Sequence, residues 1–419
     1  TFERYLNRAE PLADVRHVMD VQSVELVCTG LLAGLHVVQG GISRPFRIEP
    51  NPQNEGLSNV VWDFSGEDAQ FRGGKLAALV ELRDGDVRSE IQNLDNMAIN
   101  FIDLVNEVHR AGVGLNGESG NDFFVEYPRV LNGLGNYDAN GDGEFDQSYI
   151  FRVTGSNRLQ AQQQVGLAGT MTLPAPEGEI QIDYAATDTV SDIVARINNS
   201  RAEVVARLDR NGHLTLKGTP AANLENPDFV IRGLQDSGQF LAGYAGILQG
   251  SGAENAYTWQ EPNAVLGLQG GDLEYAVAPL QHPSGWIQVN EELKNEPAAV
   301  AAALPNESGD GSVGNGDAAL EIASIRNQAV MVGQVSTFED YFADTVAEVG
   351  LKGEQAREAL QTNELIMKDL RDMRASISGV NIDEEIAEMI KFQHGYQAAA
   401  RFVTQIDTML NTIINRMGA

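Results

Sequence analysis

The feature that most limits the folds open to this chain is an apolar stripe in its C-terminal segment, from Val380 onward. Between Gly395 and Gly418 the segment contains neither proline nor glycine. Its apolar residues follow one another at alternating steps of three and four: Met389, Phe392, Tyr396, Ala399, Val403, Ile406, Leu410, Ile413 and Met417. A mean period of about 3.5 residues is typical of a helix that packs in a coiled coil. The pattern therefore predicts a C-terminal helix that contacts a partner helix or another copy of the chain.

Two other stretches have helical patterns. The first covers residues 73–112 and carries a second stripe of the same kind, formed by Val87, Ile91, Leu94, Ala98, Phe101, Val105 and Val108. The second runs from about residue 337 to residue 377, and Ser336 followed by Glu339 predicts a capping box at its start. A helix of about forty residues spans about 60 Å, which is longer than a compact domain needs. We therefore expect an elongated bundle of coiled-coil-like helices.

A segment of different character interrupts this helical pattern. Residues 114–285 are rich in Gly, Asp and Asn and contain short runs of alternating apolar residues, which predict β-structure. Residues 178–218 are the most readable part: a strand, a short helix capped by Thr189 with Asp192, and two strands joined at Asn211-Gly212. An Asn-Gly pair between alternating strands favours a two-residue hairpin turn.

The predicted fold is therefore α+β, with a β-rich insertion in the helical bundle. We divide the chain into residues 1–113, the first part of a helical core with short strands; 114–285, the insertion; 286–379, the second part of the core; and 380–419, a polymerisation helix.

Charge and composition exclude several classes of partner. The 59 acidic and 29 basic residues give a net charge of -30, which repels nucleic acid and anionic lipid. No apolar run reaches the roughly 18 residues that a membrane-spanning helix needs. Cys28 is the single cysteine, so an intrachain disulfide is impossible. We therefore expect neither nucleic acid nor membrane as a partner.

One loop has the spacing of a calcium site. Oxygen ligands at the required positions are Asp138, Asn140, Asp142, the Glu144 carbonyl and Asp146, with Gly143 at the sharp turn. Tyr149 stands where a bidentate Glu normally completes such a loop, so any affinity should be weak. The competing interpretation is a polar surface turn that holds no ion.

Catalytic motifs are missing from the sequence. It has neither a G-x-S-x-G nucleophile elbow nor a phosphate-binding G-x-x-x-x-G-K-[ST] loop. Its six histidines are scattered without the spacing of a zinc site. We therefore predict no enzymatic activity and no cofactor, calcium excepted.

Several stretches resemble the flagellar hook-associated protein 1 family, in family order. They are residues 73–117, GDAALEIASIRNQAVM (316–331), STFEDYFADTVAEVGLKGEQAREAL (336–360), residues 373–385 and GVNIDEEIAEMIKFQHGYQAAARFVTQIDTMLNTII (379–414). In addition, residues 178–218 are similar to a small repeat motif of flagellins and hook-associated proteins, with Ile197-Asn198 at the matching place. The family's long N-terminal helix has no match here, so we expect the chain to lack that segment.

This resemblance implies a structural adaptor at the hook–filament junction that assembles by helix packing. It implies four partners: copies of the chain, the hook protein, the second junction protein and a flagellar export chaperone. It places the protein outside the cell, exported without a cleaved signal peptide, or in the periplasm where flagella are internal. The expected subunit and chaperone packing residues are Met389, Phe392, Tyr396, Val403, Ile406, Leu410 and Ile413.

Two alternatives remain open. A hook or distal-rod axial protein would have a similar C-terminal helix, but it would lack the matched segments 73–117 and 316–360. A calcium-binding extracellular adhesin would explain the acidity and the loop from Asp138 to Asp146, although a single loop without a repeat array argues against it. A secreted hydrolase lacks any supporting motif.

Overall fold

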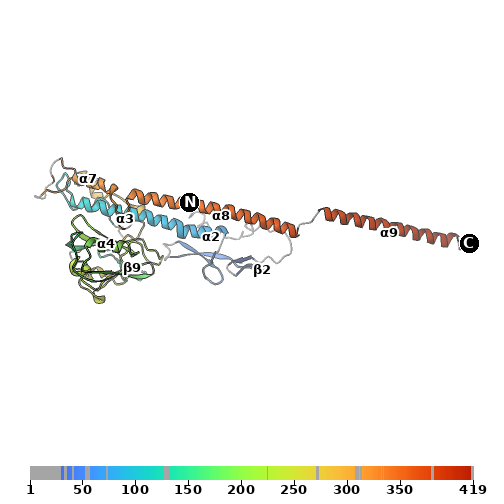
Figure 1. Cartoon of the computed structure of the whole chain (residues 1–419), viewed down its shortest axis with the longest axis horizontal. Helices are drawn as coiled ribbons and strands as arrows, with labels where there is room; N and C mark the ends of the chain where they lie inside the picture. Colours follow the sequence, from blue (N-terminus) through green and yellow to red (C-terminus); the bar gives the residue numbers. More distant parts are fainter. Residues whose placement is uncertain are drawn as a thin grey trace. The chain divides into compact units, whose positions relative to one another are not determined.

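The computed structural model contains both long helices and β-sheets (Figure 1), which confirms the predicted α+β class. The structure describes residues 30–32, 35–39, 42–51, 57–71, 74–126, 132–223, 225–269, 273–306, 311, 314–331, 333, 335–378 and 382–416. Contacts along the chain define two compact units, Thr1–Thr345 and Val346–Ala419. The four-part division drawn from the sequence stays a prediction.

Short antiparallel strands come first in the described chain. They are β1 (Gly30–Leu32), β2 (Leu35–Gln39), β3 (Ile42–Ser43), β4 (Phe46–Pro50) and β5 (Ser58–Trp62). β1, β2 and β3 form one sheet, and β4 pairs with β5 in another. In the sequence, apolar runs broken by glycines predict short strands within residues 26–46, and the structure confirms them from Gly30 onward. Residues 1–20, whose sequence also predicts the end of a helix, lie outside the described residues, as does Cys28.

A long helical stretch follows, as its pattern predicts. It consists of α2 (Gly74–Glu81), the π-helical segment η3 (Leu82–Val87) and α3 (Arg88–Ala111). The predicted stripe is only partly the buried face: Val105 and Val108 are buried, whereas Val87, Leu94 and Phe101 are exposed. Another face of α3 packs against the β-rich part, and it carries the buried Asp103. The coiled-coil seam of α3 stays a prediction.

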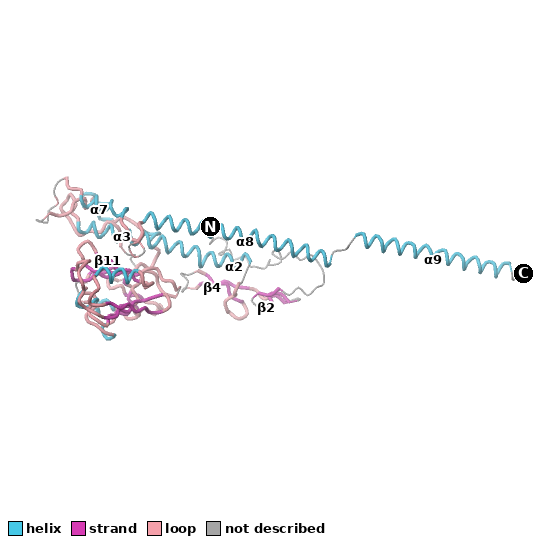
Figure 2. The backbone as a smooth tube through the Cα atoms, in the orientation of Figure 1, coloured by secondary structure: helices cyan, strands magenta, loops and turns pink. Residues whose placement is uncertain are grey.

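The β-rich part of the chain lies beside α3 (Figures 1 and 2). Among the described residues it contains two antiparallel four-stranded sheets, ordered β10-β9-β13-β14 and β11-β12-β8-β15, and the small pair β6-β7. The strands are β6 (Asn136–Tyr137), β7 (Gln147–Ser148), β8 (Ile150–Arg158), β9 (Gly169–Ala175), β10 (Gly178–Tyr184), β11 (Val204–Leu208), β12 (His213–Gly218), β13 (Gly233–Asp236), β14 (Tyr257–Thr258) and β15 (Glu274–Val277). A shared core joins the two large sheets and includes Val153, Met171, Ile193, Leu216 and Phe240.

The predicted β-α-β-β unit is confirmed. Between β10 and β11 lies α4 (Val190–Asn198), whose apolar face is buried in the shared core. Its capping box is also confirmed: Thr189 Oγ1 accepts the Asp192 N–H at 3.2 Å, and the Asp192 carboxylate accepts the Thr189 N–H at 2.9 Å.

The hairpin turn between β11 and β12 differs from the prediction. The turn is longer than two residues, because Asp209 N–H donates to the His213 carbonyl and Gly212 N–H donates to the Asp209 carbonyl. Gly212 alone takes a left-handed φ of 86°. This is the three-residue hairpin loop, a turn followed by a left-handed glycine, which an Asn-Gly pair also suits.

Short helical segments connect the remaining elements. They are η4 (Phe240–Tyr244), η5 (Ala253–Asn255), η6 (Ala264–Gly267), α5 (Pro283–Trp286), α6 (Glu291–Asn295), η7 (Pro297–Ala299), α7 (Asp317–Ser324) and η8 (Ile325–Asn327). Ala318 of α7 and Ile325 of η8 pack with Leu104, Val105 and Val108 of α3, so this segment returns the chain to the helical stretch.

Two long helices end the chain: α8 (Phe338–Ser378) and α9 (Ile382–Arg416). Both agree with the helical pattern of the sequence. The predicted cap of α8 was one residue out of place, because Thr337 and Asp340 form it: Thr337 Oγ1 accepts the Asp340 N–H at 3.1 Å. The chain offers two overlapping Ser/Thr-x-x-Asp/Glu pairs here, and the helix begins at the second. In the described residues, no helix is long and apolar enough to cross a membrane.

Candidate assembly surfaces and a buried ionic contact

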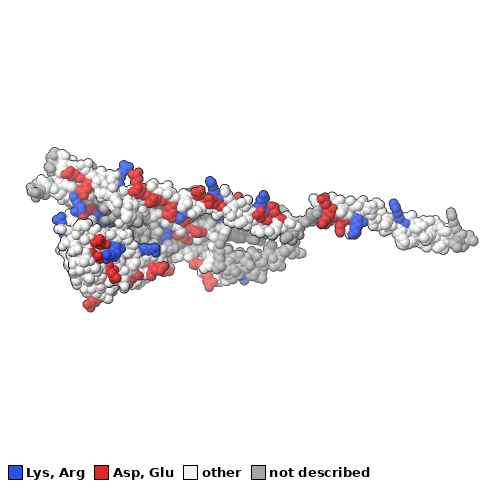
Figure 3. Space-filling model, in the orientation of Figure 1, with Lys and Arg blue, Asp and Glu red and all other residues white. Residues whose placement is uncertain are grey.

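The predicted packing residues all lie on α9, and all are exposed. Their exposed fractions range from 41% at Ile406 to 77% at Tyr396. The full set is Met389, Phe392, Tyr396, Val403, Ile406, Leu410 and Ile413. Steps of three and four bring these side chains to one face of the helix. Few charged side chains interrupt the second half of α9 (Figure 3). Their contact with other copies or with a chaperone stays a prediction.

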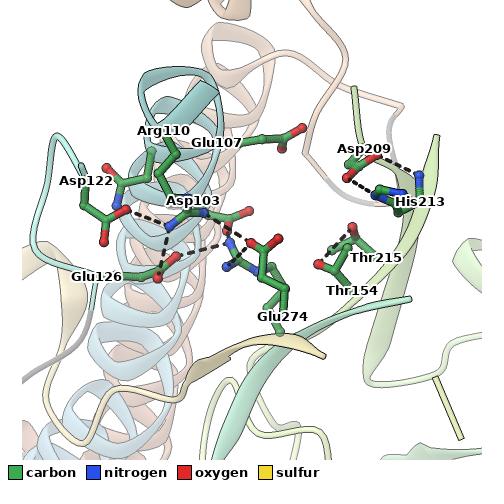
Figure 4. Close-up of polar contacts among 12 residues, drawn as sticks. Asp103, Glu107, Arg110, Asp122, Glu126, Thr154, Asp209, His213, Thr215 and Glu274 are labelled. Carbon is green, nitrogen blue, oxygen red and sulfur yellow. Dashed lines mark hydrogen bonds and ion pairs between the residues drawn. The ribbon is translucent and has the colours of Figure 1, made fainter. Parts of the chain in front are cut away.

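The structure also contains a buried ionic contact, which joins α3 to the β-rich part (Figure 4). Asp103 on α3 is 1% exposed and pairs with Arg152 of β8 and Lys217 of β12. Arg152 also donates to Glu126 and Glu274, each at 3.1 Å. The Arg152 guanidinium thus binds three carboxylates: one on α3, one in the segment that follows α3, and one on β15.

A second row of ion pairs borders this contact. Arg207 of β11 pairs with Glu107, one helical turn after Asp103. On the other side, Arg110 pairs with Asp122 at 2.7 Å and with Glu126 at 3.5 Å. A polar cavity of about 240 Å³ lies beside these side chains, lined in part by Glu107, Arg110, Arg152, Arg207 and Glu274. Its charged groups pair with one another, which suits a structural contact better than a catalytic one.

Burial and neighbouring charges shift the pKa values of the carboxyl groups in this contact. Burial by itself raises the pKa of the Asp103 carboxyl, but the positive charges of Arg152, Lys217 and Arg207 outweigh it and hold that pKa well below its usual range. Burial raises the pKa of Glu126, and the arginines beside it only partly offset this. Asp103 is therefore the anchoring charge of the network.

The low pKa of Asp103 predicts acid sensitivity. Because its pKa is lower in the folded chain than in the unfolded chain, Asp103 contributes stability above its unfolded pKa of about 4. That contribution is lost as the pH falls further, toward the folded pKa. We expect the free energy of unfolding to drop below about pH 4, and to drop less in an Asp103→Asn variant. Urea unfolding at a series of pH values measures both; parallel pH curves would contradict this role of Asp103.

Aromatic and amide groups connect α3 to the first turn of α8. The rings of Phe101 and Phe338 meet edge to face, with centroids 5.9 Å apart. Tyr341 Oη donates to Asn93 Oδ1 at 2.9 Å and accepts from Asn96 Nδ2 at 3.4 Å. Phe101, which the sequence assigns to a coiled-coil stripe, thus contacts the start of a second helix despite its partial exposure.

The ionic contact was not predicted from the sequence. Its members come from distant parts of the chain. Lys217 takes a polar position in the alternating LTLKG, whereas Arg152 in YIFRVT is a single charge within an apolar run. Such a charge rarely becomes buried without a partner. A charge within an apolar run was therefore the one signal of this contact in the sequence. It indicates that an oppositely charged partner exists, but it does not show which residue that partner is.

The loop of the predicted calcium site is closed by its own hydrogen bonds. The Asp138 carboxylate accepts N–H groups from Gly141 at 2.6 Å and Gly143 at 2.8 Å. Asn140 Oδ1 accepts the Asp142 N–H, Asp142 Oδ1 accepts the Glu144 N–H, and the Asp146 carboxylate accepts the Ala139 N–H. These are the bonds of a polar turn. The N–H groups of Gly143 and Gly141 lower the pKa of the exposed Asp138 carboxyl.

Tyr149 cannot complete the loop. Its ring is buried and lies 4.7 Å from that of Tyr137 and 5.7 Å from that of Trp259, measured between centroids. Within the described part of the chain, no three His, Cys, Asp or Glu side chains are arranged to hold a metal ion. Calcium binding by Asp138, Asn140, Asp142, Asp146 and the Glu144 carbonyl stays a prediction.

We expect any calcium affinity of this loop to lie in the range of about 10⁻⁴ to 10⁻³ M, as for extracellular modules. Binding requires the Asp138 and Asp142 oxygens to exchange backbone N–H groups for the ion, and the bidentate ligand is missing. NMR titration of the loop amides with calcium measures this, with an Asp138→Asn variant as the control. Amide shifts that are absent at millimolar calcium, or equal in the variant, would contradict a calcium site.

Family models match three stretches of the chain. The helical domain of flagellar hook-associated protein FlgK matches residues 13–124, and the flagellin hook IN motif matches residues 169–219. The C-terminal model of the flagellar basal body rod FlgEFG proteins matches residues 374–417. These stretches correspond to the α2–α3 region, the β-α-β-β unit and α9.

Curated relatives carry one name. Flagellar hook-associated protein 1 of Escherichia coli (strain K12) is 22% identical over 91% of this chain and 57% of its own length. The protein of that name from Salmonella typhimurium is also 22% identical, over 91% of this chain and 58% of its own length. The Bacillus subtilis (strain 168) protein is 30% identical over 36% of this chain and 30% of its own length. The chain thus spans less than two thirds of each relative. The resemblance read from the sequence is confirmed: over 91% of its length, the chain is similar to curated proteins named flagellar hook-associated protein 1.

Proposed function

We propose that this chain is a structural component of the bacterial flagellum, an adaptor at the hook–filament junction. The observation that carries the proposal is its similarity, over 91% of its length, to proteins named flagellar hook-associated protein 1. The helical-domain match at residues 13–124 favours the junction protein over a hook or distal-rod protein, since the rod-protein model covers residues 374–417 alone.

Assembly by helix packing follows from the exposed apolar residues of the two long helices. α8 has 41 residues and α9 has 35, so at 1.5 Å per residue they are about 60 Å and about 50 Å long. Apolar side chains such as Leu360, Leu370, Phe392 and Leu410 are each about half exposed or more. Exposed apolar stripes of this length indicate an interaction surface. We infer that these helices complete an elongated, coiled-coil-like bundle by packing between subunits.

The partners we propose are copies of the chain, the hook protein, the second junction protein and, before export, a flagellar chaperone. The location is the external flagellum, or the periplasm where flagella are internal. We propose no catalytic activity, because the buried charges around Asp103 pair with one another in a contact between elements. The calcium-binding adhesin is the weaker alternative, since it rests on the loop from Asp138 to Asp146 alone.

Immunogold labelling tests the location. Antibodies against residues 132–223, which include most strands of the β-rich part, are applied to hook–filament preparations from the source organism. We expect label in a narrow band where the hook meets the filament. Label along the whole filament, along the hook or on the cell wall would contradict the proposal, and cell-wall label would favour the adhesin.

A further inference from the structure

The Ile-Asn pair of the matched motif stands at the end of α4, and its two side chains have different surroundings. Ile197 is 1% exposed and packs in the shared core of the β-rich part. Asn198 is only partly buried, and its side-chain amide turns toward β11. Asn198 Oδ1 accepts the Ala206 N–H at 2.8 Å, and Asn198 Nδ2 donates to the Ala206 carbonyl at 2.9 Å.

This amide substitutes for a neighbouring strand. β11 is the outer strand of the sheet β11-β12-β8-β15, and it pairs with β12 on its inner side. In an antiparallel ladder, the N–H and the carbonyl of one residue point to the same side. Because both groups of Ala206 bond to Asn198, they point away from β12, toward the free edge. Asn198 therefore covers a strand edge that would otherwise offer unpaired peptide groups.

The same amide also reaches a distant segment. Asn198 Nδ2 donates to the carbonyl of Gly333 at 3.2 Å. Gly333 lies in the turn closed by the bridge between Met331 and Ser336, directly before α8. A Cβ atom at Gly333 would stand 2.8 Å from Cβ of Asn198, and its φ of +68° is left-handed. Only glycine fits a backbone that passes so close in this conformation.

We propose that the Ile-Asn pair is a clamp that fixes the β-rich part to the segment leading into α8. Ile197 anchors α4 in the core, and the Asn198 amide holds the edge of β11 and the turn at Gly333 together. A second tie, from Arg210 in the β11–β12 turn to Glu321 at 3.2 Å, holds the same unit to α7, which packs against α3. The inference goes beyond the proposed function, since it concerns contacts within one chain.

The alternative is that Asn198 covers the strand edge alone, with Gly333 near it by chance. Two substitutions separate these roles, because an aspartate keeps an acceptor for the Ala206 N–H but loses both N–H donors. In Asn198→Asp we expect the amides of residues 330–336 to exchange about tenfold faster, while the Ala206 amide keeps its protection. In Asn198→Ala we expect both regions to exchange faster. Hydrogen exchange of the full chain, followed by mass spectrometry, measures this.

The matched control is Asn199→Ala, which changes the same residue type at the next, exposed position. It should leave both regions unchanged. Gly333→Ala provides the reciprocal test where Asn198→Ala disturbs the core: residues 330–336 should exchange faster while the Ala206 amide stays protected. Unchanged exchange at residues 330–336 in both Asn198 variants would overturn the clamp, and so would equal acceleration in Asn199→Ala.

Discussion

Replacing Asp103 by Asn should lower the free energy of unfolding of the β-rich part and α3 by about 3–5 kcal/mol. The carboxylate is 1% exposed and pairs with Arg152 and Lys217, whose side chains are 4% and 5% exposed. An amide of the same shape removes the negative charge, which leaves the buried Lys217 ammonium without the carboxylate that pairs with it, while Arg152 keeps Glu126 and Glu274. A buried charge that loses its partner keeps its full desolvation cost. Urea unfolding of the full chain, followed by near-ultraviolet circular dichroism, measures the loss.

An exposed ion pair provides the control for this prediction. Arg326 and Glu339 are 3.2 Å apart, and their side chains are 75% and 73% exposed. Glu339→Gln removes one negative charge, as Asp103→Asn does, but it should change stability by no more than about 1 kcal/mol, because water screens such a pair. Similar losses in the two variants would show that burial does not set the strength of the Asp103 contact.

The sequence predicts those parts of the fold that depend on neighbours along the chain. The β-α-β-β unit is readable because alternating strands, the Thr189 cap and the Asn-Gly turn all occur within residues 178–218. The long helices are readable because their apolar periodicity continues over many turns. Even the errors in these regions are local: the cap of α8 lies one residue later, and the hairpin turn is one residue longer.

Contacts between distant segments could not be predicted in this way. Asp103, Arg152 and Lys217 come from a helix and two strands, and their local patterns do not show that they meet. Asp103 lies off the predicted stripe of α3, and Lys217 takes a polar position in the alternating LTLKG. Asn198 is recognisable as part of a motif, but its bond to Gly333 joins residues 135 positions apart. The periodicity of α3 indicates a stripe without indicating which neighbour covers it. In the single chain Phe101 of that stripe contacts Phe338, whereas Val87 and Leu94 are exposed.

The second prediction of a large effect concerns the C-terminal helix α9, and it assumes that this helix binds the proposed export chaperone. Replacing Val403, Ile406 and Leu410 by Asp should abolish chaperone binding while leaving the β-rich part folded. All three side chains lie on the apolar face of α9 and are 41–59% exposed, so the free chain tolerates the charges. In a complex, the same charges would be buried in an apolar interface without partners, at a cost of several kcal/mol. Each 1.4 kcal/mol weakens binding about tenfold, so micromolar affinity would become undetectable.

The matched control places the same three charges on the opposite face of α9. Gln405, Thr408 and Thr412 lie about half a helical turn away from the apolar stripe, by the spacing of about 100° per residue. The triple variant Gln405→Asp, Thr408→Asp, Thr412→Asp adds the same negative charge to an already acidic protein, so electrostatic repulsion is equal in both. Calorimetry with the purified chaperone should show binding to the control and none to the stripe variant. If both variants bind equally well, the apolar face of α9 is not the chaperone site, and the exposed stripe of α8 becomes the surface to test. If both fail, the added charge, and not the burial of apolar side chains, accounts for the loss.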